Sequence, residues 1–441
     1  MSERILLAGG RVIDPASGTD ALLDVLVEGG VVGAIGPALN VDGARRVDVG
    51  GCIVAPGFVD LHAHLREPGF EQKGTIATET EAALRGGFTT VCAMPNTSPP
   101  PDSGTIVESL LERIARDARV RVLPIGCTTR GRSGNEVAEL SELAAAGCVA
   151  FSDDGNPVAH GAVMRNAMML AGSLGLAVSE HCDDPLLSGG GVMNEGRVSE
   201  RLGLAGQPTS AEVSAIARNI ALCEATGARL HIAHVTTARG LELVAEAKRR
   251  GVLVTCEVTP SHLFLTEDAV FGSDAVAAFD TNAKINPPLR TEADRRALCA
   301  GLNAGIIDAI ATDHAPHAIE DKLCEFDNAA FGISCFETAL GTLLTQVGRG
   351  ELDLGAVLRA LTAGPVAAFG LAGRLPGAGR LAEGFPADIT VFDPGSRWAV
   401  DVQRFASKGR NSPLQGVELG GAVRAVLVGG EFAFAGEVAR A

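Results

Sequence analysis

Short apolar runs alternate with amphipathic stretches from residue 56 onward, and this alternation strongly limits how the chain can fold. Most runs are continuously apolar, which is typical of parallel strands covered by helices on both faces. Strand followed by helix, repeated eight times, predicts an α/β protein built on a closed (β/α)8 TIM barrel. In chain order the eight runs are FVDLHAHL, FTTVCAMPN, RVRVLPIGC, CVAFSDDG, LGLAVSEH, ARLHIAHV, GVLVTCEVTP and IIDAIATDHAPH.

Amphipathic stretches fill the gaps between these runs and are predicted to be the barrel helices. The connection from Ser261 to Arg290 is long for a barrel loop, so it is predicted to be a functional loop or an insertion. The predicted helices are Thr75–Arg85, Ile106–Arg116, Glu136–Ala146, Ala162–Ser173, Ala211–Thr226, Ala238–Arg250, Phe336–Gly348 and Leu354–Phe369.

The two ends of the chain have a different pattern, with short strand-like pieces, glycine turns and no clear helix. The pieces VLVEGGVVGAIG near the start and VLVGGEFAFAGE near the end even resemble each other. We expect residues 1–55 and 372–441 to pair into one small composite β-sandwich beside a barrel of residues 56–371. A terminal extension that only decorates the barrel is the alternative.

The net charge and the cysteine pattern limit which binding partners and which cellular compartment are expected. The formal net charge of −16 argues against nucleic acid or an anionic membrane as a partner. The start, MSERILLAGGRVIDP, lacks the sustained apolar core of a secretory signal. The sequence also has no uncharged apolar run long enough to predict a membrane span. Ten scattered cysteines without a C-x-x-C pair predict reduced thiols in a cytoplasmic protein.

The stretch VDLHAHLREPG places two of the nine histidines in the first apolar run. Residues i and i+2 of a strand point to the same side, so His62 and His64 should project together, followed by Arg66. This arrangement suits a metal ion or an anionic ligand, although the polar face of an ordinary strand would have the same pattern.

Polar residues also mark the ends of other predicted strands. The carboxyl ends of all barrel strands meet at one mouth, where active sites lie, so these side chains should converge there. Imidazole and carboxylate ligands without a thiolate suit Zn²⁺ or a similar divalent ion. The two adjacent aspartates could instead cap the following loop, and at most one of them should face inward. The residues are Asn96, Asp153, Asp154, His181, His234, Asp313 and His317.

Other candidates have a simpler interpretation. A lone buried histidine is usually a hydrogen-bonded core residue, and we predict this for His160, His231, His262 and His314. Cys182 is predicted to be a neighbour of the site and not a ligand.

Several blocks of the chain resemble dihydroorotases of the type I bacterial kind, within the amidohydrolase superfamily. GFVDLHAHLREPG is similar to the first family signature, and ATDHAPHAIEDK to the second, which is long and specific. Ser261 stands where such enzymes often have histidine, at a position that is not a metal ligand in the family. Further similar blocks, which extend the resemblance over essentially the whole chain, are MPNTSPP, FSDDG, EVTPSHLFL and NAKINPPLR.

The resemblance implies a centre of two metal ions per subunit, or of one, with Zn²⁺ as the expected metal. His62, His64 and Asp313 would hold one ion, His181 and His234 the other, and Asp154 would bridge them.

The same resemblance implies the substrate contacts. Arg66, Asn96 and His317 are similar to residues that hold the substrate carboxylate, and His64 would also contact the substrate. Asn286 and the backbone at Phe331 and Gly332 are similar to groups that contact the ring amide.

The bridging group separates this chain from hydantoinases, which use a carboxylated lysine at the end of the fourth strand. The lysines here are Lys73, Lys248, Lys284, Lys322 and Lys408, and none lies near residue 150. An aspartate at 153 or 154 would supply the same single negative charge on a shorter arm.

The implied activity is the reversible cyclisation of N-carbamoyl-L-aspartate to (S)-dihydroorotate plus water, in de novo pyrimidine (UMP) biosynthesis. A metal-bound hydroxide would attack the ring amide in the hydrolytic direction, and Asp313 would act as general acid and base. Arg66 could hold a carboxylate by a charge-assisted fork.

Two rival functions stay open at this stage. Another cyclic amidase, a hydantoinase or an allantoinase, is disfavoured by the missing lysine and by Arg66. A non-catalytic scaffold beside aspartate carbamoyltransferase is disfavoured because every expected ligand residue is present. The expected partners are a small-molecule substrate, further copies of the chain and aspartate carbamoyltransferase.

Overall fold

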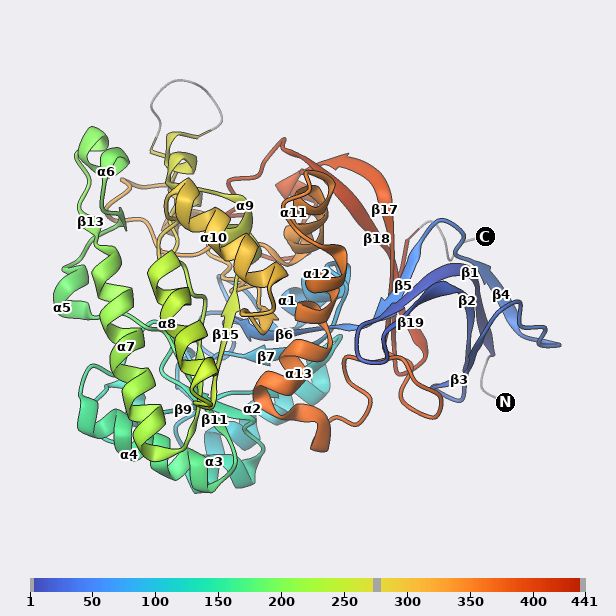
Figure 1. Cartoon of the computed structure of the whole chain (residues 1–441), viewed down its shortest axis with the longest axis horizontal. Coiled ribbons are helices and arrows are strands. Elements are labelled where there is room, and N and C mark those ends of the chain that lie inside the picture. The colour runs from blue at the N-terminus through green and yellow to red at the C-terminus, as the bar shows by residue number, and fades with distance from the viewer. Residues whose placement is uncertain (1–3, 273–278, 437–441) are drawn as a thin grey trace.

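The computed structural model describes residues 4–272 and 279–436. Parallel strands surrounded by helices form one part of the molecule, and strands from both chain ends form the other (Figure 1). None of the described helices is both long enough and apolar enough to cross a membrane.

Each of the eight predicted runs contains a strand, and these strands pair in parallel. One sheet has the order β6-β7-β8, and a second has the order β9-β10-β11-β14-β15-β16. Every residue of β6 and β7 is buried, which explains why their sequences are continuously apolar. The bounds are β6 Phe58–Ala63, β7 Phe88–Ala93, β8 Arg121–Pro124, β9 Gly126–Cys127, β10 Ala150–Ser152, β11 Ala177–Glu180, β14 Arg229–Ile232, β15 Val254–Val258 and β16 Ala309–Ile310.

Backbone hydrogen bonds join the two parallel sheets on both sides. Beside β8 and β9, the amide of Ile125 donates to the carbonyl of Ala93 at 3.0 Å. Beyond β16, the amide of Asp313 donates to the carbonyl of His62 at 2.9 Å, and the amide of His64 donates to His314 at 2.9 Å. The segment after the last strand therefore lies against the end of the first.

Helices follow most of the strands, and most of the predicted ones lie close to their predicted bounds, whereas the helix at Glu292–Asn303 was not predicted. They are α1 Ile76–Arg85, α2 Gly104–Asp117, α3 Leu140–Ala146, α4 Gly161–Ser173, α7 Thr209–Thr226, α8 Ala238–Arg249, α10 Glu292–Asn303, α11 Phe336–Gly348, α12 Leu354–Leu361 and α13 Ala363–Phe369.

Two helix predictions need correction. A single helix over 354–369 was wrong, because the chain breaks at Thr362, whose φ and ψ are −126° and −90°. Pro365 accounts for the break, since it cannot donate a hydrogen bond to residue 361 and its ring crowds that carbonyl. The third helix begins at Leu140 and not at 136, because residue 137 pairs instead with Thr129 in an isolated bridge.

Short elements lie in the connections after several strands. The stretch after β15 corresponds to the long connection predicted from Ser261 to Arg290, of which residues 273–278 lie outside the described residues. The elements are α5 Pro185–Ser188, β12 Met193–Asn194, α6 Arg197–Leu202, β13 Gly206–Gln207, α9 Pro260–Phe264 and the 3-10 turns η1 Arg130–Arg132, η2 Glu267–Phe271, η3 Thr281–Ala283, η4 Ile319–Asp321, η5 Leu371–Gly373 and η6 Val402–Arg404.

The two chain ends pair into one sheet of eight strands, seen at the right of Figure 1. Its order is β19-β18-β17-β5-β1-β2-β3, and β4 pairs with β1. The antiparallel pair of β5 and β17 joins the N-terminal strands to the C-terminal ones. The bounds are β1 Ile5–Asp14, β2 Thr19–Glu28, β3 Val31–Gly36, β4 Arg45–Asp48, β5 Ile53–Pro56, β17 Ile389–Ala399, β18 Glu418–Val428 and β19 Glu431–Ala435.

Aromatic packing ties this sheet to the parallel strands. The ring of Phe58 on β6 lies 5.8 Å from that of Phe88 on β7 and 6.3 Å from that of Phe392 on β17. The amide of Gly57 donates to the carbonyl of Asp388 at 2.9 Å. Strand β6, which carries the H-x-H pair, is therefore anchored to both parts of the molecule.

Candidate metal centre and substrate site

The predicted ligand residues lie at or just beyond the carboxyl ends of five parallel strands. All of them are at most 5% exposed. They are His62 and His64 at β6, Asp154 after β10, His181 after β11, His234 after β14 and Asp313 after β16.

Asp154 lies at the centre of four imidazoles. Its Oδ1 atom is 3.3 Å from Nε2 of His62, 3.5 Å from Nε2 of His234 and 3.7 Å from Nδ1 of His181. Its Oδ2 atom is 3.5 Å from Nε2 of His64. Two groups of candidate ligands, each with its ligand atoms within 4.8 Å of one another, share this one carboxylate.

Asp313 borders the same cluster from the other side. Its Oδ1 atom lies 3.0 Å from Nε2 of His64 and 3.5 Å from Nε2 of His62. Asp60 brings this segment close, since its carboxylate accepts hydrogen bonds from the amide and the hydroxyl of Thr312 at 3.0 and 2.5 Å.

Asp153 and Asp154 have different partners although they are adjacent. Asp153 accepts hydrogen bonds from the amides of Thr128 and Thr129 and from the Thr129 hydroxyl, so it holds the loop after β9. Burial raises the pKa of Asp153 to about 6. Burial opposes ionisation of Asp154 too, but attraction to His62 and the nearby imidazoles of His181 and His234 hold its pKa well below the usual range. Asp154 is therefore the aspartate that faces the imidazoles.

The residues present fit a divalent metal ion. Among the described residues, Nε2 of His62 and Oδ1 of Asp154 are buried without a hydrogen-bond partner, and both face the cluster. Although burial opposes it, the nearby carboxylates of Asp154, Glu257 and Asp313 raise the pKa of His62 well above its usual value. A metal ion would supply the positive charge that these carboxylates attract, and imidazole with carboxylate is a ligand set for such ions.

Arg66 and His317 lie together beside the cluster. Arg66 donates from Nε to the carbonyl of Pro316 at 3.0 Å, and its Nη2 atom lies 3.2 Å from Nε2 of His317. Burial lowers the pKa of Arg66 to about 10, so it stays a cation at neutral pH. Burial and the neighbouring cations Arg66 and Lys73 lower the pKa of His317 to about 3, so this imidazole is neutral.

Asn96 contacts a candidate ligand and not Arg66. Its Oδ1 atom accepts a hydrogen bond from Nδ1 of His64 at 2.8 Å, which leaves Nε2 of His64 without a proton and directed at the cluster. In this structure Asn96 orients an imidazole.

The three residues predicted to contact a ring amide are differently engaged. Nδ2 of Asn286 lies 3.2 Å from Nε2 of His181, and its Oδ1 atom is buried without a partner among the described residues. The carbonyl of Phe331 accepts from Nε2 of His317 at 2.8 Å. The amide of Gly332 donates to the carbonyl of Lys284 at 2.9 Å. Oδ1 of Asn286 is therefore the atom left free to accept a hydrogen bond from a ring amide.

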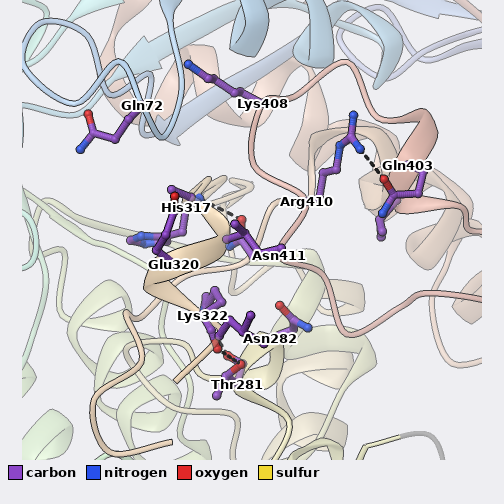
Figure 2. Close-up of a pocket in the computed structure, with 14 residues that line it drawn as sticks. Gln72, Thr281, Asn282, His317, Glu320, Lys322, Gln403, Lys408, Arg410 and Asn411 are labelled. Atoms are coloured by element: carbon purple, nitrogen blue, oxygen red, sulfur yellow. Dashed lines mark hydrogen bonds between the residues drawn. The ribbon is translucent and has the colours of Figure 1, made fainter. Parts of the chain in front are cut away.

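A cavity of about 580 Å³ borders His317 (Figure 2). Figure 2 shows His317 in its wall, with Lys408 and Arg410 on one side and Lys322 on the other. These three side chains donate to carbonyl or side-chain amide oxygens and not to carboxylates within the described part of the chain. Burial lowers the pKa of Lys322 to about 7, so this lysine is only partly protonated at neutral pH. Glu320 is the one carboxylate among the described lining residues, so the wall carries a surplus of positive charge.

The sequence interpretation missed one residue of the site and misjudged another. Glu257, within the apolar run of β15, bonds His62 and His231, and its only signal was a glutamate inside a buried strand. The predicted core histidines His231, His262 and His314 are buried and hydrogen-bonded, as expected. The same prediction was wrong for His160, which is exposed at the start of α4.

Comparison with known families gives the class of protein that this fold and site define. The profile of the Amidohydrolase family matches residues 209–434, and that of the Dihydro-orotase-like family matches residues 51–239. The fold is similar to L-hydantoinase from Arthrobacter aurescens, with a TM-score of 0.87, 26% identity and coverage of 99% of this chain and 97% of that one. It is also similar to D-hydantoinase from Thermus sp., with a TM-score of 0.82, 26% identity and coverage of 98% and 95%. The chain belongs to the amidohydrolases.

Curated relatives narrow the family. The chain is 49% identical to the dihydroorotase of Anaeromyxobacter sp. (strain K), over 98% of each chain. It is 47% identical to the dihydroorotase of Pelotomaculum thermopropionicum, over 99% of this chain and 100% of that one. Within the amidohydrolases, the chain is therefore a member of the dihydroorotase family.

Proposed function

We propose that this protein is a dihydroorotase, which interconverts N-carbamoyl-L-aspartate and (S)-dihydroorotate plus water in pyrimidine biosynthesis. The observation that carries the proposal is identity of 49% with a dihydroorotase over 98% of both chains. The cluster of four imidazoles around Asp154, with Arg66 and His317 beside it, supports an enzyme and not a scaffold.

We further propose that the two parallel sheets are parts of one closed (β/α)8 barrel. The hydrogen bonds from Asp313 to His62 and from Ile125 to Ala93 support closure. The barrel would comprise residues 56–371, and residues 1–55 with 372–441 would form the β-sandwich. The buried core shared by Val12, Val54 and Val391 supports that second unit.

The proposed cofactor is Zn²⁺, with two ions per subunit. His62, His64 and Asp313 would hold one ion, His181 and His234 would hold the other, and Asp154 would bridge them. Bound there, the metal would polarise the amide carbonyl and make a water molecule more acidic.

In ring opening, Asp313 takes the proton of the attacking water and delivers it to the leaving ring nitrogen. Burial opposes ionisation of Asp313, but the adjacent imidazole of His64 and attraction to His62 hold its pKa below the usual value, so the carboxylate is ready to accept a proton. In cyclisation, Asp313 carries the proton in the opposite direction.

Arg66 binds the carboxylate of the substrate, and His317 adds a neutral hydrogen-bonding imidazole beside it. Nε of Arg66 donates to the carbonyl of Pro316, and the ring of His317 lies against Nη2, which restricts the plane of the guanidinium. A planar cation held in this way recognises a carboxylate with defined geometry. The Oδ1 atom of Asn286 accepts a hydrogen bond from the ring amide.

A different cyclic amidase is the second candidate, because the similar solved structures at 26% identity are hydantoinases. The absence of a lysine near residue 150 and the presence of Arg66 favour dihydroorotase. Turnover of dihydroorotate, hydantoin and allantoin by one preparation separates these functions. We expect dihydroorotate to be the preferred substrate, and preference for hydantoin or allantoin would overturn the proposal.

The ten free cysteines, nine of them buried, support a reducing, cytoplasmic setting. Self-association and association with aspartate carbamoyltransferase stay predictions from the family resemblance.

A further inference from the structure

Glu257, on β15, is buried between two imidazoles that belong to two other strands. Its Oε1 atom lies 2.8 Å from Nδ1 of His62, and its Oε2 atom lies 3.0 Å from Nε2 of His231. The side chain is 1% exposed. The proposed reaction gives this carboxylate no proton to carry and no substrate atom to touch.

The hydrogen-bond partners assign the protons along this chain of side chains. An ionised carboxylate only accepts hydrogen bonds, so His62 donates from Nδ1 and His231 donates from Nε2. Nδ1 of His231 is then an acceptor, and the hydroxyl of Thr255 lies 2.8 Å away to donate to it. Every polar atom of His231 and both oxygens of Glu257 are thereby engaged.

The consequence for His62 is a fixed tautomer. Since Nδ1 keeps its proton against Glu257, the neutral ring that binds a metal ion has its lone pair on Nε2, and this atom lies 3.3 Å from Oδ1 of Asp154. Among the described residues, Nε2 of His62 has no hydrogen-bond partner. Its lone pair is thus directed at the place where a metal ligand is required.

We infer that Glu257 is a positioning residue for the metal centre, and that His231 holds Glu257 in place. Glu257 sets the ring orientation and the proton position of His62, and it adds a negative charge behind a ligand of a divalent ion. Removing such an outer partner typically lowers metal affinity about 10- to 100-fold. The inference rests on the metal centre of the proposed function.

Glu257→Gln is the variant that tests this role. Glutamine has nearly the same size but only one acceptor oxygen, so it cannot accept from both imidazoles. Its amide nitrogen would favour a proton on the metal-facing atom of His62 or leave His231 unpaired. In competition with a chromophoric chelator, we expect E257Q to bind Zn²⁺ about 10- to 100-fold more weakly than the unaltered protein at one site.

Glu79→Gln is the matched control. Glu79 is also fully buried, and its Oε2 atom lies 2.7 Å from Nε2 of His314, which is not a proposed ligand. E79Q should keep unaltered Zn²⁺ affinity, while thermal unfolding reports any loss of stability in both variants. Unaltered affinity in folded E257Q, or an equal loss in E79Q, overturns the positioning role.

Glu257→Asp keeps the test decisive if E257Q does not fold. Aspartate retains the charge but is too short to reach both imidazoles, so weaker Zn²⁺ binding is again expected and unaltered affinity again overturns the inference. Turnover of dihydroorotate by the unaltered protein is measured on the same preparation. Zn²⁺ binding without turnover would remove the proposed function, whereas the affinity of E257Q decides the inference about Glu257.

Discussion

At the scale of single residues, three side chains of the proposed site sit on strained backbone. Arg66, His234 and Asp313 have φ values of 67°, 31° and 49°, a region that residues other than glycine rarely adopt. Ala38 and Arg132 are the other non-glycine residues with positive φ in the described ranges. Such strain costs about 1–3 kcal/mol per residue and persists where the surrounding structure and the function require it.

Asp313→Ala should abolish most turnover without unfolding the protein. Loss of a general acid and base typically lowers the rate about 10²- to 10⁴-fold, and a proposed metal ligand is lost as well. Assays of dihydroorotate hydrolysis, together with thermal unfolding, measure both effects. Retention of most activity would refute the proton-transfer role.

Arg66→Ala should weaken binding of dihydroorotate far more than binding of dihydrouracil, which lacks the carboxylate. Loss of a charged hydrogen-bonding partner is worth about 1.5–3 kcal/mol, or roughly a 10- to 100-fold rise in KM. Steady-state kinetics or competitive inhibition with the two compounds gives the comparison. Equal losses for both compounds would mean that Arg66 only supports the fold.

Single residues also show what the sequence could predict about the site. The ligand candidates were found because they stand at strand ends, where a barrel brings side chains together. Glu257 was missed, since its partners His62 and His231 lie far away in the chain and only the fold reveals them. His160 was misjudged because one sequence does not show whether a residue before a helix is buried.

At the scale of secondary-structure elements, the periodic parts of the sequence were the most predictable. All eight apolar runs contain a strand. They could be recognised because a strand buried on both faces needs a continuous apolar sequence. The short elements between residues 185 and 207 were not foreseen, because segments of two to six residues are too short for a periodic pattern. Pro365 was a sequence signal for the break at Thr362, but the continuous apolar pattern favoured a single helix.

The aspartate that follows β10 leads to a prediction about the bicarbonate dependence of the activity. Asp154 follows this strand and faces the imidazoles, and none of the five lysines of the chain lies near it. No lysine carbamate is then needed, so added bicarbonate should leave the activity of the metal-loaded enzyme unchanged. A bicarbonate requirement in the same assay would show that the assignment of the bridge to Asp154 is wrong.

At the scale of the whole molecule, the local charge around one cavity is opposite in sign to the net charge of the chain. The chain carries −16, yet the cavity beside His317 is lined by Lys322, Lys408 and Arg410. Local positive charge raises the concentration of an anionic substrate, and salt screens the effect. We therefore predict that the positive charge of this wall attracts the open-chain substrate, which is a dianion.

Lys408→Gln combined with Arg410→Gln should lower kcat/KM for N-carbamoyl-L-aspartate roughly 3- to 10-fold at low ionic strength, because substrate attraction is weakened. The difference from the unaltered enzyme should shrink as salt is added. Arg165→Gln, an exposed charge on α4, is the control and should have little effect. A double variant that behaves like R165Q at every salt concentration would contradict the role of the cavity.

The pairing of the two chain ends was predicted from their shared strand pattern, and in the structure β5 pairs with β17. The order of the eight strands was not predictable, since partners such as Ile53 and Phe392 lie far apart in the chain and many pairings satisfy the same apolar pattern.

The most direct test of the account is cyclisation of N-carbamoyl-L-aspartate before chelation, after chelation and after return of Zn²⁺. We expect dihydroorotate to form, its formation to stop when the metal is removed, and activity to return with Zn²⁺ while the protein stays folded throughout. Undiminished dihydroorotate formation by fully metal-depleted protein, or none by the Zn²⁺-loaded protein, would contradict the central claim.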